Sequence, residues 1–170
     1  MQSDELRALQ APIKARYRED PETALITMTA RGTLDLDRIA CRIETRDDRV
    51  DSGLHPAAGG DGTLLCSGDM LLEALVACAG VTLASVATAM NLPVSGGSVT
   101  AEGDLDFRGT LAVDRTTPVG FRDVRLHFEL DTTATEEQVG KLIALTERYC
   151  VVFQTINNRP NLSVSHAIVS

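Results

Sequence analysis

Four cysteines give this 170-residue chain its most reactive side chains. Cys78 lies inside the apolar run EALVACAG, Cys150 lies inside RYCVVF, and Cys41 and Cys66 precede both. No two of them form a C-x-x-C pair, and the three histidines are not at zinc-finger spacing, so we expect no metal site. A cysteine thiolate attacks peroxides and disulfides, so thiol redox chemistry is what these residues could perform.

Packing is the alternative explanation, because free cysteine is among the most buried residue types and behaves as a small hydrophobe. We interpret Cys41 and Cys66 in that way. The stretches around Cys78 and Cys150 are different, since Ala, Val, Leu and Thr could have filled the same space without an oxidisable sulfur. Charged side chains also precede both cysteines, namely Asp69, Glu73, Glu147 and Arg148.

Composition and charge restrict the class of protein. With 44% hydrophobic and 24% charged residues, the chain is expected to fold as a single domain over residues 1–170, with 1–22 as an N-terminal extension. A net charge of −8 and the absence of Trp disfavour nucleic acid as a partner. The polar N-terminus resembles no signal peptide, which favours the reducing cytoplasm.

The uncharged run over residues 74–90 is 17 residues long, which is shorter than a comfortable membrane span. Asp69 and Glu73 lie directly upstream of it. We therefore expect a buried core helix over 67–90, capped by Ser67 or Asp69, and no membrane association.

Hydrophobic periodicity predicts the remaining elements. A second helix is expected from Thr135, with Gln138 in capping-box position, to about Ile156. Its apolar stripe comprises Val139, Leu142, Ile143, Thr146, Tyr149, Cys150 and Phe153.

Strands are expected over 24–32, 39–46, 98–109, 121–131 and 161–169, and the loop over 110–119 is long enough to be a flap. Residues 4–18 have helical spacing, but Pro12 makes a continuous helix doubtful. The order of elements indicates an α+β fold with antiparallel sheet.

The helix expected over 67–90 is apolar on nearly every face, so it should be buried on nearly every side. One domain of this size cannot surround such a helix completely. The sequence therefore predicts a homodimer built around it.

Three stretches together resemble the OsmC/Ohr family, named for osmotically induced protein C and the organic hydroperoxide resistance protein. They are HPAAGGDG, LLCSGDMLLEALVACAGVTLASVA and TERYCVVFQTI. The order of elements agrees with that family from about Ala24 onward. The chain looks like a divergent, OsmC-like member, because Asp69 stands where the family usually has Glu and Cys150 lacks the Cys-Pro-Tyr-Ser context.

The resemblance implies an intertwined dimer whose antiparallel sheets wrap two long central helices, with two sites at the interface. It implies a thiol peroxidase that reduces organic hydroperoxides without a metal or organic cofactor. Cys78 matches the peroxidatic cysteine, Cys150 the resolving cysteine and Asp69 the acidic residue of the helix start. Arg31 is the first candidate for the activating arginine and Arg38 the second. A lipoyl-type dithiol is the implied reductant.

Two physical requirements follow from this assignment. Burial alone would raise the pKa of Cys78, so a nearby guanidinium would be needed to lower it. Asp69 and Cys78 are nine residues apart, which on a continuous helix means about 13 Å and opposite faces. Either the helix begins after Asp69, or Asp69 serves the site of the other subunit.

The apolar side chains expected around the site, Leu75, Val81, Tyr149 and Phe153, favour a fatty or aryl hydroperoxide over hydrogen peroxide. Two other functions remain open at this point. The chain could be a non-catalytic dimer of the same fold that binds a small apolar ligand, or a redox sensor whose disulfide changes shape without turnover.

Overall fold

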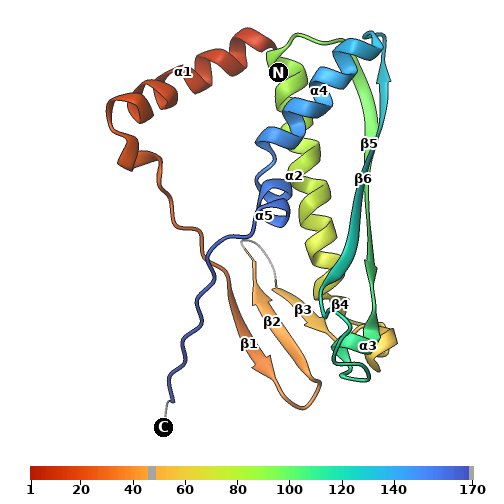
Figure 1. Cartoon of the computed structure of the whole chain (residues 1–170). Helices are drawn as coiled ribbons and strands as arrows, with labels where there is room; N and C mark the ends of the chain where they lie inside the picture. The colour runs from red at the N-terminus through yellow and green to blue at the C-terminus, as the bar shows by residue number, and fades with distance from the viewer. Residues whose placement is uncertain (46–48, 169–170) are drawn as a thin grey trace.

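The computed structural model describes residues 1–45 and 49–168, and the long helix α2 (Ser67–Ala89) lies at its centre. Strands β5 (Val94–Leu105) and β6 (Phe121–Thr132) run along one side of α2 (Figure 1). Helices α4 (Glu136–Tyr149) and α5 (Val151–Asn157) cover another side. The predicted α+β class with antiparallel sheet is confirmed.

A four-stranded sheet lies at the end of the molecule where α2 begins (Figure 1). Its order is β1-β2-β3-β4, antiparallel except for the parallel pair of β3 and β4. The strands are β1 (Arg31–Asp35), β2 (Ala40–Glu44), β3 (Arg49–Gly53) and β4 (Leu65–Cys66). The other elements are α1 (Ser3–Glu19), α3 (Phe107–Thr110) and the 3-10 turns η1 (Pro21–Ala24) and η2 (Pro56–Ala58).

Helix α2 forms where the sequence predicts it, because it is rich in Leu and Ala and contains no proline. The predicted caps are wrong: Cys66 is the N-cap residue, and its side chain makes no capping hydrogen bond. By length and composition α2 could cross a membrane. In this fold one stripe of it is buried against β5, β6 and α4, made of Leu75, Ala79, Leu83 and Ala87.

A single chain does not surround α2 completely, which agrees with the expectation from its sequence. A second stripe on the far side of the helix is exposed, and we call it the open face of α2: Ala74, Ala77, Val81 and Ala84. Val81 is 73% exposed. Exposed apolar surface of this kind is typical of contact faces in proteins.

Strands β5 and β6 form a long antiparallel ribbon with the predicted alternation. Val124, Leu126 and Phe128 turn toward the core, whereas Arg125 is exposed and pairs with Glu102 and Asp104 across the ribbon. A two-stranded ribbon is marginally stable alone. Its position therefore depends on the apolar contact with α2.

The second predicted helix begins as expected and ends differently. The capping box is confirmed: the Thr135 amide donates to Gln138 Oε1 at 2.9 Å, and the Gln138 amide donates to Thr135 Oγ1 at 3.3 Å. The prediction of one helix to about Ile156 is wrong, because Cys150 has extended dihedral angles, φ −73° and ψ 109°. Two β-branched residues, Val151 and Val152, follow this break, and such residues favour helix less strongly.

The N-terminal region contradicts two expectations. Pro12 does not interrupt α1, which runs continuously and projects from the body like an arm (Figure 1). The strand expected over 24–32 is present only from Arg31, and residues 25–30 are extended and exposed without a strand partner. Residues 40–44 of the next expected strand are confirmed, and its end at Arg46 lies outside the described residues.

The C-terminal strand expected over 161–169 is not formed within this chain. Residues 159–168 are extended, belong to no helix or strand, and are exposed, while Val169 lies outside the described residues. Leu162, Val164 and Ile168 are at least 80% exposed. Like residues 25–30, this segment has strand-like sequence and conformation but no neighbouring strand.

Candidate active site

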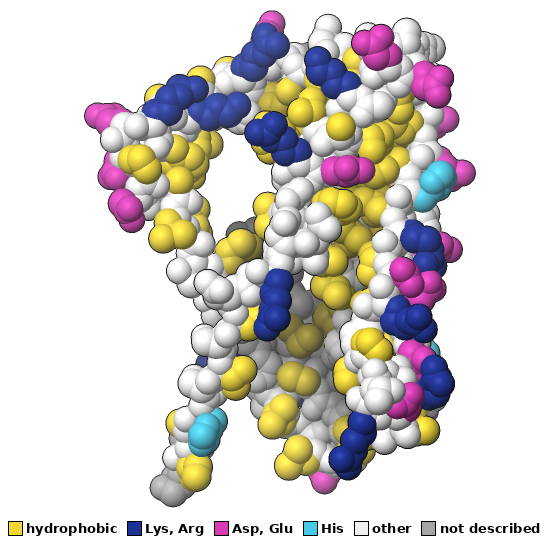
Figure 2. Space-filling view, in the orientation of Figure 1, with side chains coloured by type: hydrophobic (Ala, Val, Ile, Leu, Met, Phe, Trp, Pro, Cys, Tyr) yellow, Lys and Arg dark blue, Asp and Glu magenta, His cyan; other side chains and the backbone are white. Residues whose placement is uncertain are grey.

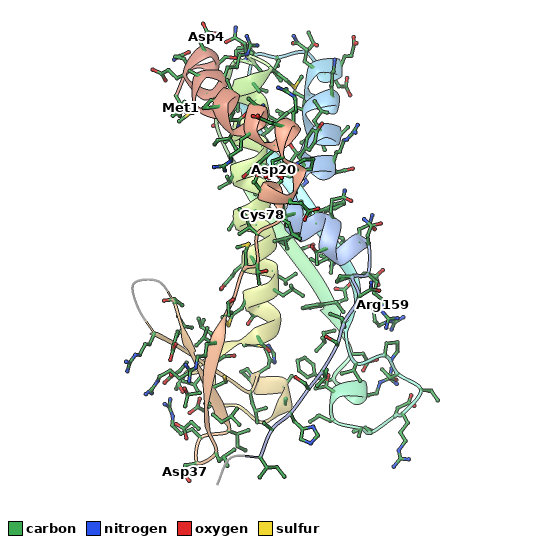
Figure 3. The ribbon with its side chains drawn as sticks, turned by 90° about the vertical axis from the view of Figure 1, so that its left-hand side faces the viewer. Met1, Asp4, Asp20, Asp37, Cys78 and Arg159 are labelled. Atoms are coloured by element: carbon green, nitrogen blue, oxygen red, sulfur yellow. The ribbon has the colours of Figure 1, made fainter. Side chains whose placement is uncertain are left out.

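The fold brings the two helical cysteines together. Cys78 lies near the middle of α2 (Figure 3) and is half-buried, whereas Cys150 lies at the α4–α5 break and is 1% exposed. Both are free thiols, and they lie close enough for each to shift the pKa of the other. They belong to one apolar cluster, which includes Leu75, Ala79, Val99, Ala101, Val124, Leu126, Phe128 and Phe153.

The break at Cys150 supplies hydrogen-bond donors to this cluster. The first turn of any helix leaves its amides without backbone acceptors, and here the first bond within α5 runs from the Gln154 amide to the Cys150 carbonyl at 2.9 Å. The amides of Val151 and Val152 are instead within reach of the Cys78 thiol. A continuous helix would have used those amides internally.

These contacts lower the pKa of Cys78. Burial of the thiol raises its pKa, but the Val152 amide, the Cys150 thiol, the Val151 amide and the Thr82 hydroxyl lower it. The four donors outweigh burial, so the pKa of Cys78 lies below its ordinary value. Cys78 is therefore the thiol of this pair that ionises first.

The pKa of Cys150 is shifted in the opposite direction. Burial raises its pKa, the Phe153 amide lowers it, and the neighbouring Cys78 raises it again through hydrogen bonding and charge. The net result is a pKa above the ordinary value. As the pH rises, Cys78 therefore loses its proton before Cys150, so Cys78 is the better nucleophile of the pair.

Asp69 is not brought to Cys78 within one chain. Helix α2 begins at Ser67 and is continuous, so the alternative that the helix starts after Asp69 is wrong. Asp69 is exposed in the first turn, about 13 Å along the axis from Cys78 and on the opposite side of the helix.

The arginine candidates belong to the β1–β2 hairpin of the four-stranded sheet. Arg31 is exposed at the start of β1. Arg38 donates to Asp51 at 3.0 Å, and Arg42 donates to the same carboxylate at 2.8 Å. The Arg42 hydrogen bond, assisted by Arg38, lowers the pKa of Asp51 to about 2. Within residues 1–45 and 49–168, no arginine is among the groups that shift the pKa of Cys78.

The other expected site residues divide into two groups. Leu75 is buried and Phe153 is half-buried beside the cysteines, but Val81 is on the open face of α2 and Tyr149 is 58% exposed. Cys41 is half-buried in β2. Cys66 is half-buried at the N-cap position of α2, whereas the α4–α5 break lies beside Cys78, near the middle of that helix.

Sequence reasoning missed the donors that the structure places around Cys78. Backbone amides leave no residue-type signal, although the run CVVF could have indicated the break that frees them. Thr82 could have been found, because residues i and i+4 lie on the same side of a helix.

Two further features were compared with the thiol pair: clusters of metal-binding side chains and the cavities of the described residues. Among the residues that the structure describes, no group of three or more His, Cys, Asp or Glu could hold a metal ion. A cavity between α1, α2 and β5 is lined by Leu83, Ala87, Asn91, Val94 and other residues, but by none of the cysteines. The thiol pair is therefore the candidate active site.

A half-buried thiol with a lowered pKa lies beside a buried thiol with a raised pKa, on an α+β scaffold around one apolar helix, and such a pair is suited to thiol–disulfide chemistry. The chain belongs to the OsmC-like protein family, whose sequence model matches residues 60–165, more than half of the chain. The sequence has no significant match among curated proteins.

Solved structures of OsmC-like proteins share the fold at low identity. An OsmC-like protein from Mycoplasma pneumoniae is similar with a TM-score of 0.65 and 16% identity, covering 79% of this chain and 89% of that chain. An organic hydroperoxide resistance protein OsmC from Legionella pneumophila has a TM-score of 0.62 and 22% identity over 79% and 91%. An organic hydroperoxide resistance protein of Bacillus subtilis has a TM-score of 0.55 and 16% identity over 79% and 93%.

Proposed function

We propose that this protein is a thiol peroxidase that reduces organic hydroperoxides to alcohols. The opposite pKa shifts of two adjacent thiols carry the proposal, because a peroxidase of this type needs one ionised and one protonated cysteine. Membership of the OsmC-like family supports it, and so do the names of the Legionella and Bacillus proteins.

The first step oxidises Cys78. Its thiolate attacks one oxygen of the hydroperoxide, the O–O bond breaks, and the leaving alkoxide takes a proton to become the alcohol. Cys78 is then a sulfenic acid. Two electrons have moved from sulfur to the peroxide.

The second step forms a disulfide. The Cys150 thiol attacks the sulfenic sulfur of Cys78, an S–S bond forms, and the hydroxyl group leaves as water with the Cys150 proton. An external dithiol then reduces the disulfide by two exchange steps, which restores both thiols and leaves the reductant as a cyclic disulfide. A lipoyl-type dithiol in the cytoplasm fits this role, and no step uses a metal or organic cofactor.

The active form in this proposal is an intertwined homodimer. The open face of α2 and the unpaired extended segments over 25–30 and 159–168 support it, because all three expose apolar or strand-forming surface. Figure 2 shows hydrophobic side chains gathered in the middle of the molecule, between α4–α5 and β6. In the dimer, Asp69 and Arg31 of the partner subunit complete the site.

The apolar surroundings of Cys78 define the substrate class. Leu75, Phe153 and the core side of β5–β6 surround the thiol pair with apolar side chains, and the open face of α2 would add further apolar wall in a dimer. A fatty or aryl hydroperoxide gains burial energy there that hydrogen peroxide does not.

Turnover tests the proposal. The reduced protein with dihydrolipoamide is expected to consume cumene hydroperoxide at least tenfold faster than hydrogen peroxide, since burial of an aryl group contributes more than about 1.4 kcal/mol. Hydroperoxide loss at the rate of a protein-free control would contradict the peroxidase. A single stoichiometric oxidation without further turnover would identify a redox sensor instead.

Cys150→Ser is expected to stop the cycle after the first step. The serine hydroxyl cannot form the disulfide, so Cys78 sulfenic acid should accumulate and react with dimedone, adding the mass of one adduct to the Cys78 peptide. The wild-type protein, treated in the same way, should give little adduct because Cys150 removes the sulfenic acid. Equal adduct yields in both proteins would remove Cys150 from the mechanism.

A further inference from the structure

The break between α4 and α5 turns the usual backbone donor of the Glu147 carbonyl away from it. In a continuous helix this carbonyl accepts from the Val151 amide, four residues later. At Cys150 ψ is 109°, about 150° from its value in a helix, so the Val151 N–H points in a different direction. The Cys150 amide still donates to the Thr146 carbonyl at 2.9 Å. The chain therefore leaves the helix at a single torsion angle.

The side chain of Gln154 takes the place of the missing donor. Its Nε2 donates to the Glu147 carbonyl at 2.8 Å, across the break and seven residues back in the chain. Asn158 Nδ2 donates to Gln154 Oε1 at 2.9 Å and to the Gln154 carbonyl at 3.1 Å, which orients the Gln154 amide group. These side-chain bonds tie α5 to the last turn of α4.

The direction of α5 decides what covers the thiol pair. Helix α5 packs against α2, and its Val152 and Phe153 lie against the apolar cluster that includes Cys150 (Figure 1). Cys150 is 1% exposed although it lies between two helices. If the Val151 amide bonded to the Glu147 carbonyl, α5 would continue along the axis of α4. Val152 and Phe153 would then leave the cluster.

We propose that Gln154 is a positioning residue that holds α5 over the two thiols by occupying the Glu147 carbonyl. Without this bond, the apolar stripe that continues with helical spacing through Phe153 favours a continuous helix, which uncovers Cys150. The shielding of Cys150 requires no peroxide. Its consequence for catalysis rests on the proposed function: a covered Cys150 is kept from external thiols and reacts with the sulfenic acid of Cys78.

The test is the initial rate at which iodoacetamide alkylates Cys150 in the reduced protein at fixed pH, measured by mass on the peptide that contains it. Gln154→Met keeps the length of the side chain and a similar helix propensity, but removes the donor. Alkylation of Cys150 is expected to become about threefold faster, the effect of one lost hydrogen bond on a local opening. Gln154→Lys restores an N–H donor on a flexible stem and should return the rate toward the wild-type value.

Thr155→Val is the matched control. Thr155 also lies in α5 and donates a side-chain bond of 2.8 Å, but to the Val151 carbonyl of the same helix, so its loss does not release α5 from α4. The rate at Cys150 should equal that of the wild type. An unchanged rate in Gln154→Met, or an equal rise in Thr155→Val, would overturn the inference.

Cys41 and Cys66 report unfolding of the whole chain, because both lie outside α4 and α5. Their alkylation rates should not change in Gln154→Met. If they rise with Cys150, the variant folds poorly and Asn158→Ala decides, since it removes only the bonds that orient Gln154. Asn158→Ala should accelerate alkylation at Cys150 and not at Cys41 or Cys66, and the absence of that change would overturn the inference.

A second readout separates this inference from the proposed function. The wild-type protein is treated with one equivalent of cumene hydroperoxide and examined for the Cys78–Cys150 disulfide. If the disulfide fails to form but Gln154→Met still uncovers Cys150, the peroxidase is wrong and the Gln154 assignment stands. If the disulfide forms and the rate at Cys150 is unchanged in Gln154→Met, only the Gln154 assignment is wrong.

Discussion

Cys78→Ser is expected to lower hydroperoxide turnover by more than about a thousandfold, because a serine hydroxyl does not ionise or reduce a peroxide under these conditions. The same variant should form no intramolecular disulfide with Cys150. Peroxide consumption with a dithiol donor, combined with peptide mass analysis, checks both outcomes.

Cys41→Ser and Cys66→Ser are the matched controls. Both cysteines are half-buried and lie outside the thiol pair, so these variants should keep turnover near the wild-type value. Ser is also a favourable N-cap residue, which should preserve the start of α2 in Cys66→Ser. Full activity in Cys78→Ser would show that a different residue reacts with the peroxide.

Val81→Arg is expected to separate the proposed dimer into monomers. Val81 is on the open face of α2, and burying an unpaired guanidinium in an apolar interface costs several kcal/mol. Because the proposal draws Asp69 and Arg31 from the partner subunit, turnover should fall by more than tenfold in parallel. Sedimentation at micromolar concentration measures the association directly.

Val113→Arg provides a control of equal exposure. Val113 and Val81 are both 73% exposed, but Val113 lies in the loop between α3 and β6, away from α2. The Val113 variant should sediment and turn over like the wild type. A wild-type protein that is a stable monomer, or a Val81→Arg dimer as stable as the wild type, would contradict the proposed assembly.

Hydrophobic periodicity predicted α2, β2, β6 and the start of α4 within a few residues. It missed β3, and the end of the strand expected over 98–109 forms α3 instead. The start and end of α2, the alternation of β6 and the capping box at Thr135 and Gln138 all depend on local sequence and on one buried face. They are correctly predicted because local propensity and packing agree.

Prediction from the sequence was wrong where the backbone conformation depends on contacts with residues that are distant in the sequence. The segments 25–30 and 159–168 have strand-forming sequences, but a strand requires a partner, and they pair with no strand among residues 1–45 and 49–168. The break at Cys150 was hidden because the apolar stripe continues with helical spacing through Cys150 to Phe153.

In the candidate site, too, some features were expected from the sequence and others were missed. The pairing of Cys78 and Cys150 was expected from the family resemblance, and the structure brings the two thiols together. Activation by an arginine was expected as well, because burial alone would raise the pKa of Cys78 and the family resemblance implied an arginine. The backbone amides were missed because no residue type marks a free amide. Within one chain, the amides of Val151 and Val152 and the Thr82 hydroxyl lower the pKa of Cys78 instead.

The pKa shifts also determine how the site responds to pH. Since the pKa of Cys78 is lowered, its thiolate persists below the pH at which an ordinary cysteine, with a pKa of about 8.5, is half ionised. Reactivity should therefore fall only as the pH drops through the lowered value. Cys150 should keep its proton over that range, because its pKa is raised.

The most direct measurement is disulfide mapping after a single oxidation. The fully reduced protein is treated with one equivalent of cumene hydroperoxide, quenched with an alkylating agent and digested for mass analysis. We expect one intramolecular bond between Cys78 and Cys150, with Cys41 and Cys66 alkylated. Recovery of Cys78 and Cys150 as alkylated thiols, with the hydroperoxide unconsumed, would contradict the account.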